Sequence, residues 1–425
     1  MSKTSKKNAI YGQSGGVTAV INSSASGVIS AWREHQDEVG VLYAAENGIL
    51  GALNEELIDT SCISDDVVKN LRYTPGGAFG SCRYKLKNLA ENRQQYERLI
   101  EVFAAHDIGY FLYNGGNDSA DTCLKVAEIA KELGYPLQAV HIPKTIDNDL
   151  VITDNCPGFG SVAKYVATSI KEAGIDLASM YATSTKVFIL EVMGRHAGWI
   201  AAGAALASDN ELSPPHIILF PEITFDEEAF LHKVQAVVNQ VGYCVIAVSE
   251  GIRDKNGVQL SAAANVKDDF GHAQLGGVAP ILANLIKQRL NLKQHWAVAD
   301  YLQRSARHIA SRTDVEQAYA VGYAGVKYAL SGQSSVMAYI KRISQQPYLW
   351  EIDCAPLTEI ANKEKFMPRD FISVDGFHIT KKCREYMEPL IMGEDYPQFK
   401  NGLPDYVRLT HVKIAKKLQP FILIK

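Results

Sequence analysis

The sequence predicts an α/β protein with two doubly wound, Rossmann-like domains on parallel sheets, followed by a C-terminal extension. Short apolar runs alternate with amphipathic helical segments in a regular strand-then-helix order. This order favours parallel sheets covered by helices on both faces. The chain has 425 residues and is 47% hydrophobic. Because that length is too great for one small core, we expect two domains.

The expected strands are short apolar runs that end in glycine, polar or charged residues. Parallel strands buried on both faces are continuous apolar runs, unlike the alternating pattern of a half-exposed strand. Such runs occur at 9–11, 39–44, 110–113, 137–142, 186–192, 217–220, 244–248 and 296–302.

The expected helices lie between these strands, where apolar residues recur at helical spacing. We expect Asp118 or Ser119 to cap the helix that ends at Leu133, and Asp314 to cap the last long helix. Beyond Gly332, prolines divide the tail into short elements. The helices are predicted at 17–34, 91–105, up to 133, 158–179, 225–241, 276–290 and 314–330.

Charge and cysteine usage exclude several classes of protein. A net charge of −4 argues against a nucleic-acid or anionic-membrane surface, so an anionic ligand must be held by local cations. The N-terminal residues lack the apolar core of a signal peptide, and the apolar run 199–207 is too short to span a bilayer. Seven cysteines without CxxC spacing suggest neither disulfides nor zinc. We expect a cytoplasmic protein.

The stretch 143–149, Pro-Lys-Thr-Ile-Asp-Asn-Asp, carries the densest chemistry. It follows the predicted strand 137–142, and catalytic groups in open α/β sheets lie just beyond the carboxyl ends of strands. Along an extended segment, Asp147 and Asp149 would point to the same side. A solvated turn is the alternative, because Asp-Asn-Asp is also typical of turns.

Other strand ends carry glycine-rich or charged turns. The turns 12–16, 114–120 and 193–198 each join a predicted strand to a helix, where backbone N–H groups can face an anion. The loop 73–85 is glycine-rich and ends in two cations, Arg83 and Lys85. For the three turns, the alternative is that glycine serves only tight packing. For the loop 73–85, the alternative is a solvated surface loop.

The order and spacing of these segments resemble the phosphofructokinase family over residues 8–335. The tail resembles the C-terminal extension of the diphosphate-using branch. The segments that carry the resemblance are Gly12–Gly16 with Ile21 and Asn22, Gly76 and Gly77 with Arg83, Gly115–Ser119, Pro143–Asp149, Met193–Arg195, Pro221 with Glu222, and Tyr301–Arg304.

Two positions resemble the diphosphate-dependent branch rather than the ATP-using one. Asp118 and Lys144 stand where ATP-using bacterial members have glycine. A carboxylate at the place of a nucleotide α-phosphate adds bulk and like charge, whereas diphosphate stops short of it. The resemblance therefore implies phosphoryl transfer from diphosphate to the C1 hydroxyl of fructose 6-phosphate, with ATP as the alternative donor.

The resemblance also implies roles for the residues that match its motifs. Asp147 would accept the proton of the C1 hydroxyl, and Lys144 would neutralise charge on the transferred group. Gly15 would offer its backbone N–H to diphosphate, and Arg83 would bind its far phosphate. The sugar phosphate would contact Thr145, Asp147, Met193, Gly194, Arg195, Glu222, Tyr301 and Arg304.

Magnesium is the implied cofactor, because it prefers hard oxygen ligands. The family has a carboxylate at position 117, where this sequence has Asn117, whose amide oxygen carries less charge. Asp149 is therefore the better candidate ligand, directly or through water.

The resemblance further implies a homodimer or homotetramer. ATP-using relatives have arginines from a neighbouring subunit at the positions of Lys186 and His295. We expect His196 and His308 to be surface or packing residues. The implied division is a diphosphate-binding domain of 1–155 with 303–335, and a sugar-phosphate domain of 156–302 with 336–425.

Two further classes are weighed and disfavoured. Non-catalytic regulatory subunits of diphosphate enzymes tend to lose the central lysine and aspartates, whereas Lys144, Asp147 and Asp149 are present here. A dinucleotide-binding dehydrogenase would need a ribose-binding acid after a GxGxxG turn, and the sequence has none.

Overall fold

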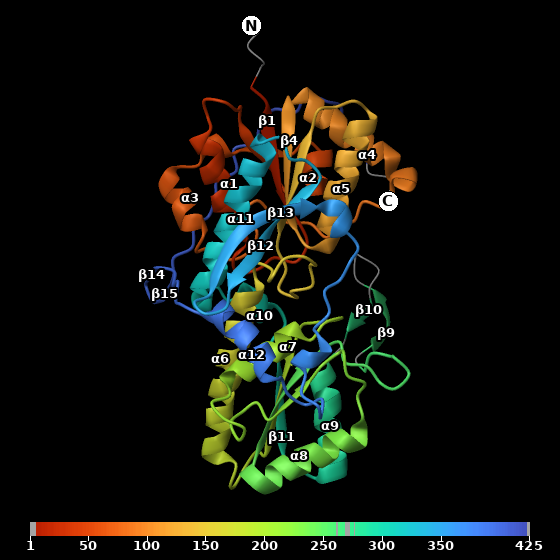
Figure 1. The fold of residues 1–425 in the computed structure, drawn as a ribbon, viewed down its shortest axis with the longest axis vertical. Coiled ribbons are helices and arrows are strands. Elements are labelled where there is room, and N and C mark those ends of the chain that lie inside the picture. Colours follow the sequence, from red (N-terminus) through yellow and green to blue (C-terminus); the bar gives the residue numbers. More distant parts are fainter. Residues whose placement is uncertain (1–5, 261, 268–272, 276, 423–425) are drawn as a thin grey trace.

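The computed structural model describes residues 6–260, 262–267, 273–275 and 277–422. Within these ranges the chain forms two α/β domains, one above the other in Figure 1. The predicted fold class is confirmed. No helix of the described residues is long and apolar enough to cross a bilayer.

The first domain is built on a seven-stranded sheet in the order β13-β12-β5-β4-β1-β2-β3. Its five central strands are parallel, and the two edge strands, β13 and β3, are antiparallel to their neighbours. The strands are β1 (Asn8–Gln13), β2 (Leu42–Ala45), β3 (Leu57–Asp59), β4 (Ile108–Gly115), β5 (Gln138–Pro143), β12 (Val336–Ser344) and β13 (Leu349–Pro356).

Helices cover both faces of this sheet, as continuous apolar strands require. One face packs against α1 (Ile21–Glu34), α3 (Asp65–Leu71) and α11 (Arg312–Leu330). The other packs against α2 (Ile49–Leu53), α4 (Leu89–Ala105) and α5 (Asn117–Glu132). Figure 1 shows the two helical layers on opposite sides of the strands.

The second domain has a four-stranded parallel sheet in the order β11-β6-β8-β7. Its strands are β6 (Val187–Val192), β7 (Ile217–Leu219), β8 (Cys244–Ser249) and β11 (Gln294–Val298). One face packs against α6 (Phe159–Met180) and α7 (Trp199–Gly203), and the other against α8 (Glu227–Val241) and α9 (Val278–Leu290). Two small antiparallel pairs complete the strands, β9 (Ala262–Lys267) with β10 (Ala273–Leu275) and β14 (Phe399–Lys400) with β15 (Leu403–Pro404).

The C-terminal extension differs from the predicted division, which assigned 336–425 to the second domain. Strands β12 and β13 instead belong to the first sheet, where Val336 and Met337 pair with Val140 and His141 of β5. Residues from Met367 to Leu390, with α12 (Lys381–Met387), fill the core of the second domain. Ile414, Leu418 and Phe421 then return to the first. The extension thus passes through both domains.

Three local predictions are also corrected. The predicted strand 296–302 ends at Val298, and α10 (Asp300–Ser305) follows it. Helix α5 begins directly after Gly116, so neither Asp118 nor Ser119 caps it. Ser311 caps α11, and the Asp314 carboxylate instead accepts N–H bonds from Gly158 and Ser161 at the start of α6. Residue 276, where a helix start was predicted, lies outside the described residues.

Candidate active site

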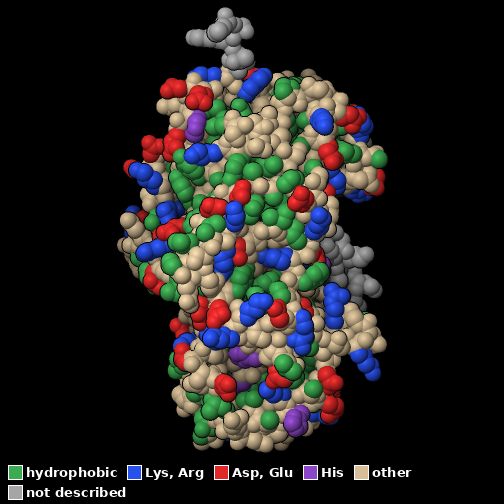
Figure 2. Space-filling model, in the orientation of Figure 1, with side chains coloured by type: hydrophobic (Ala, Val, Ile, Leu, Met, Phe, Trp, Pro, Cys, Tyr) green, Lys and Arg blue, Asp and Glu red, His purple; other side chains and the backbone are tan. Residues whose placement is uncertain are grey.

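A cavity of about 1380 Å³ is lined by residues at the carboxyl ends of parallel strands from both sheets. Figure 2 shows lysine and arginine side chains, mixed with acidic ones, around this middle level of the molecule. Ligands in open α/β sheets bind at such strand ends. The lining residues follow the strands directly: 14–17 after β1, 116–119 after β4, 144–147 and 149 after β5, 193 and 195–197 after β6, and Glu250 after β8.

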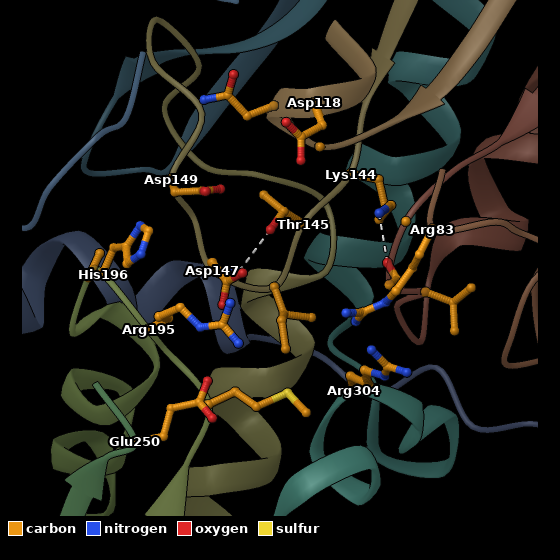
Figure 3. Close-up of a pocket in the computed structure, with 18 of the residues that line it drawn as sticks. Arg83, Asp118, Lys144, Thr145, Asp147, Asp149, Arg195, His196, Glu250 and Arg304 are labelled. Atoms are coloured by element: carbon orange, nitrogen blue, oxygen red, sulfur yellow. Dashed lines mark hydrogen bonds between the residues drawn. The ribbon is translucent and has the colours of Figure 1, made fainter. Parts of the chain in front are cut away.

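Lys144 leaves the end of β5 and points across to the turn after β1. Its side chain is only 3% exposed, and its Nζ donates to the Gly16 carbonyl at 2.7 Å, as Figure 3 shows. Burial, opposed by Asp147, lowers the pKa of Lys144 to about 8. The ammonium is therefore still mostly charged at neutral pH, and it is the cation of this strand end that can attract an anion.

Asp147 and Asp149 both line the cavity, although the left-handed Asn148 between them shows that the segment is not an extended strand. The Asp147 N–H donates to Thr145 Oγ1 at 3.1 Å. Burial and the nearby carboxylates of Asp149 and Glu250 raise the pKa of Asp147 to about 7. Burial likewise raises the pKa of Asp149. A carboxyl group with a pKa near neutrality is suited to general-base chemistry.

Two arginines complete a cationic side of the cavity with Lys144. A Cβ atom added at Gly16 would lie 2.8 Å from the Arg304 guanidinium and 3.3 Å from that of Arg83, so both guanidinium groups approach this turn closely. Arg304 also stacks on the Tyr301 ring at 3.9 Å. Figure 3 shows Arg83, Arg304 and Lys144 on one side of the cavity, opposite Asp149 and His196.

The predicted role of Gly15 as an N–H donor to diphosphate does not fit this geometry. Gly15 has a φ of +75°, a left-handed conformation that glycine adopts without strain. Its N–H is already bonded to the Cys82 carbonyl at 3.0 Å. Gly15 therefore joins the turn after β1 to the loop that carries Arg83.

The α5 start holds the two residues predicted to contact the donor and the metal. Asp118 lines the cavity but forms an ion pair with Lys85, with an N–O distance of 2.6 Å. The Asn117 side chain is used structurally, because its Oδ1 accepts from Asn362 N–H at 2.7 Å and its Nδ2 donates to the Lys363 carbonyl at 2.5 Å. This bonding does not support Asn117 as a metal ligand.

The residues predicted to bind sugar phosphate divide into two groups. Met193, Arg195 and Tyr301 line the cavity, and Figure 3 shows Arg195 pointing toward Asp147. Gly194 and Glu222 are not among its lining residues. The Glu222 carboxylate accepts N–H bonds from Gly198 at 2.9 Å and from Met367 at 3.3 Å, so it holds the second domain's loops together in this structure.

Several lining residues were not predicted. His196, expected at the surface or in packing, lies in the cavity and pairs with Glu364 at 3.0 Å. Glu250 accepts from the Gly194 N–H, and burial raises its pKa. The charged turn 249–251 was a detectable signal for Glu250, whereas Glu364 comes from the extension, far from any predicted motif.

Three basic residues discussed from the sequence lie outside this chain's cavity. His308 is exposed, as expected. Lys186 precedes β6, and His295 lies on the neighbouring edge strand β11. Neither lines the cavity.

The oxygen donors of the cavity fit a magnesium ion. Asp149 Oδ1 is buried without a hydrogen-bond partner, and a buried carboxylate oxygen normally has one. Within the described residues, no group of three or more His, Cys, Asp or Glu side chains could hold a metal ion. This is compatible with magnesium, which is commonly held by one or two carboxylates together with substrate phosphates.

Comparison with known proteins assigns the chain to a family. Residues 8–328 match the family model described as phosphofructokinase. Proteins named pyrophosphate–fructose 6-phosphate 1-phosphotransferase are 63% identical in Halomonas elongata and 64% identical in Methylococcus capsulatus. Each alignment covers 97% of this chain, with 99% and 98% of the respective relative.

A solved structure agrees with these alignments. The crystal structure of pyrophosphate-dependent phosphofructokinase from Nitrosospira multiformis matches with a TM-score of 0.91 and 60% identity, covering 98% of this chain and 100% of that one. The chain belongs to the phosphofructokinase family.

Proposed function

We propose that this protein catalyses reversible phosphoryl transfer from diphosphate to the C1 hydroxyl of D-fructose 6-phosphate. The products are fructose 1,6-bisphosphate and phosphate. The observation that carries the proposal is that Lys144, Asp147 and Asp118 line one cavity. Relatives with 58–64% identity over nearly the whole chain bear the name of this activity.

In this reaction Asp147 is the general base. The bond between the C1 oxygen and one phosphorus forms while the bridging P–O bond of diphosphate breaks. The hydroxyl proton passes to the Asp147 carboxylate, and phosphate leaves. The raised pKa of Asp147, about 7, supports this role because a base that titrates near the working pH both takes and releases the proton readily.

The cations stabilise the negative charge that moves between the phosphates. Phosphoryl transfer depends mainly on positioning and charge stabilisation. Lys144, whose Nζ lies 2.7 Å from the Gly16 carbonyl, is proposed to neutralise charge on the transferred phosphoryl group. Arg83 is proposed for the far phosphate. Arg304 lies beside Arg83 and is proposed, from the family resemblance, for the 6-phosphate of the sugar.

The remaining cavity residues are assigned to the sugar. Thr145, Met193, Arg195 and Tyr301 line the cavity near Asp147 and Arg304. Glu222 and Gly194 would reach a sugar only after a rearrangement of the bonds that now hold them, such as the one from Gly198 to Glu222.

Magnesium is the cofactor implied by the family resemblance. Asp149, with its unpartnered Oδ1, is the residue proposed to hold it together with substrate oxygens. Bound there, the ion would neutralise phosphate charge. We also propose a homo-oligomer, because Lys186 and His295 match positions that serve a neighbouring subunit in relatives and lie outside this chain's own cavity.

The deciding experiment compares initial rates with diphosphate and with ATP on purified protein, using fructose 6-phosphate and Mg²⁺. Diphosphate should support turnover in both directions, and ATP should support little. Equal use of ATP would overturn the choice of donor. Absence of fructose 1,6-bisphosphate with either donor would overturn the proposed reaction.

A further inference from the structure

A short piece of the C-terminal extension, residues 361–367, forms one wall of the cavity. We call it the strap. Asn362, Glu364 and Phe366 line the cavity, although the strap lies outside the family match of residues 8–328. No role for the strap follows from that match.

Hydrogen bonds fix the strap to the first domain at two points. Asn117 binds it through Asn362 and Lys363, as described above. The Lys365 N–H donates to the Asp149 carbonyl at 2.7 Å. The strap backbone is therefore bonded directly to the backbone of the central stretch.

The other side of the strap is fixed to the second domain. Trp199 Nε1 donates to the Lys365 carbonyl at 3.1 Å, and Met367 N–H donates to Glu222. The indole ring of Trp199 also lies 5.6 Å from the Lys365 ammonium. Lys365 is thus held between the two domains.

The Lys365 ammonium is hydrogen-bonded to the loop that carries the two aspartates, at three other residues of that loop. Its Nζ donates to Asn148 Oδ1 at 3.3 Å, to the Thr153 carbonyl at 3.1 Å and to the Asp154 carbonyl at 3.0 Å. An ammonium has three donors, and all three are used. One side chain therefore joins the beginning of this loop to its end.

Asn148 lies between the two aspartates and is bonded to other parts of the structure. It is fully buried, with a left-handed φ of 55°, and its flanking side chains, Asp147 and Asp149, line the cavity. Its Oδ1 also accepts from Cys156 N–H at 2.9 Å, and its Nδ2 donates to the Tyr386 hydroxyl at 3.2 Å. A change at Lys365 would loosen this anchor.

We propose that Lys365 is a positioning residue for phosphoryl transfer. By holding Asn148 and the carbonyls of 153 and 154, it keeps Asp147 and Asp149 directed into the cavity. The catalytic consequence of this inference rests on the proposed function, whereas the anchoring of the loop by Lys365 does not. Misplacement of a catalytic group by about 1 Å can cost ~10²-fold in rate.

The test is Lys365→Met, which keeps length and removes the charge. We expect kcat to fall by about 10–100-fold, with KM for either substrate within about threefold, because Lys365 does not line the cavity. Lys363→Met is the matched control: its side chain is exposed on the same strap and outside the cavity, so its kcat should equal that of the parent.

A double-mutant cycle separates positioning from general destabilisation. If Lys365 acts through Asp147, Lys365→Met should lower kcat little further in an Asp147→Asn background, as expected for residues that act as a unit. A full additional loss there, or an unchanged kcat in Lys365→Met alone, would overturn the proposal. Tyr386→Phe, which removes a second contact to Asn148, serves if Lys365→Met does not fold; full kcat in it would also count against the proposal.

Amide hydrogen exchange of peptides spanning 145–155 gives a readout that does not need turnover. Exchange should be faster in Lys365→Met than in the parent and in Lys363→Met. Unchanged exchange would overturn the positioning role even in an active enzyme. Faster exchange in Lys365→Met, found together with a parent protein that does not phosphorylate fructose 6-phosphate, would instead support the structural role and contradict the proposed function.

Discussion

Burial in the same cavity shifts the pKa values of Asp147 and Lys144 toward neutral pH. Burial raises the pKa of the acid to about 7 and lowers that of the amine to about 8. Each group partly offsets the shift of the other, because their opposite charges attract. The cavity thus holds a base and a cation that both remain functional near pH 7, within one short segment after β5.

Asp147→Asn should abolish most turnover while leaving the KM for fructose 6-phosphate close to normal. The carboxylate acts on the proton in the transition state and adds little to ground-state binding. The expected loss in kcat is at least about 10²-fold, measured by steady-state kinetics with diphosphate. Retention of more than about a tenth of the activity would show that another group is the base.

Asp149→Asn should affect the metal requirement. Its Oδ1 lacks a protein partner, and a neutral amide oxygen attracts Mg²⁺ less than a carboxylate does. The Mg²⁺ concentration for half-maximal rate should rise several-fold in the variant, whereas Asp147→Asn should leave it within about twofold. An equal Mg²⁺ dependence in parent and Asp149→Asn would remove Asp149 from the metal site.

Asp118 should exclude nucleotides by bulk more than by charge. Its ion pair with Lys85 offsets much of the repulsion that the sequence alone suggested. Asp118→Gly should therefore let ATP bind, and Asp118→Asn, which keeps the bulk, should not. The measurement is competitive inhibition by ATP against diphosphate.

The two variants separate the possible causes. ATP binding in Asp118→Asn as tight as in Asp118→Gly would show that charge decides. If neither binds ATP better than the parent, Asp118 has no part in donor selection. Adding Lys144→Gly to Asp118→Gly should improve ATP use and weaken diphosphate use, with non-additive effects because both residues line one cavity.

Single residues were predictable where the chemistry lies in one continuous segment. Lys144, Asp147 and Asp149 all follow a buried strand, and a common side for Asp147 and Asp149 could be inferred from alternation. His196 and Glu364 could not be paired in this way, because 168 positions separate them and only the folded extension brings them together. Lys85 in a charged loop and Asn117 in a turn gave no sign of their partners.

At the level of elements, buried strands were the most predictable and helix caps the least. Strands β4, β5, β6 and β8 coincide with apolar runs to within a few residues. Asp314 illustrates the limit for caps: a carboxylate near a helix start can bond its own helix or a neighbouring one, and here it bonds α6. That choice depends on tertiary packing, which local propensity does not encode.

Glu55, between α2 and β3, anchors the end of the extension and gives a prediction with a pH signature. Its carboxylate is 1% exposed and accepts bonds from His106 and from the N–H groups of Lys417 and Leu418. Burial alone would raise the pKa of Glu55, but these bonds outweigh it and lower the pKa. Glu55→Gln should reduce the free energy of unfolding at pH 7 by about 1–3 kcal/mol.

The sign of the pH dependence follows from the lowered pKa. The folded state binds the Glu55 proton less tightly than the unfolded state does. The stabilisation is therefore complete above the unfolded pKa of about 4.3 and is lost as pH falls through the folded value. Urea unfolding should show parent and Glu55→Gln converging below about pH 4. The control is Glu101→Gln, which removes a surface contact to Arg98 and should lower the free energy of unfolding by only ~0–1 kcal/mol. If the difference in unfolding free energy between the parent and Glu55→Gln does not narrow in acid, ionisation of Glu55 is not its cause.

At the scale of the whole molecule, the extension joins the two domains. It adds two strands to the first sheet, forms a wall of the cavity, enters the second core and returns to the first domain. The predicted division treated it as part of one domain, because its prolines suggested short elements without showing which core each would enter. Its course depends on pairing between residues far apart in the chain, such as β12 with β5.

Truncation after Pro356 should therefore prevent folding of both domains. Within the described residues, the part removed by this truncation buries eight large apolar side chains, and each contributes about 1.5–3 kcal/mol, a sum comparable to or above the ~5–15 kcal/mol that stabilises a typical domain. We expect fragment 1–356 to show no cooperative thermal transition. Leu390→Ala should lower the free energy of unfolding by about 2–5 kcal/mol. Val374→Ala, at an exposed position, should keep it within ~0.5 kcal/mol of the parent value. A soluble fragment 1–356 that unfolds cooperatively near the parental Tm would show that the domains do not need the extension. The eight side chains are those of Leu357, Ile360, Met367, Phe371, Ile372, Ile379, Met387 and Leu390.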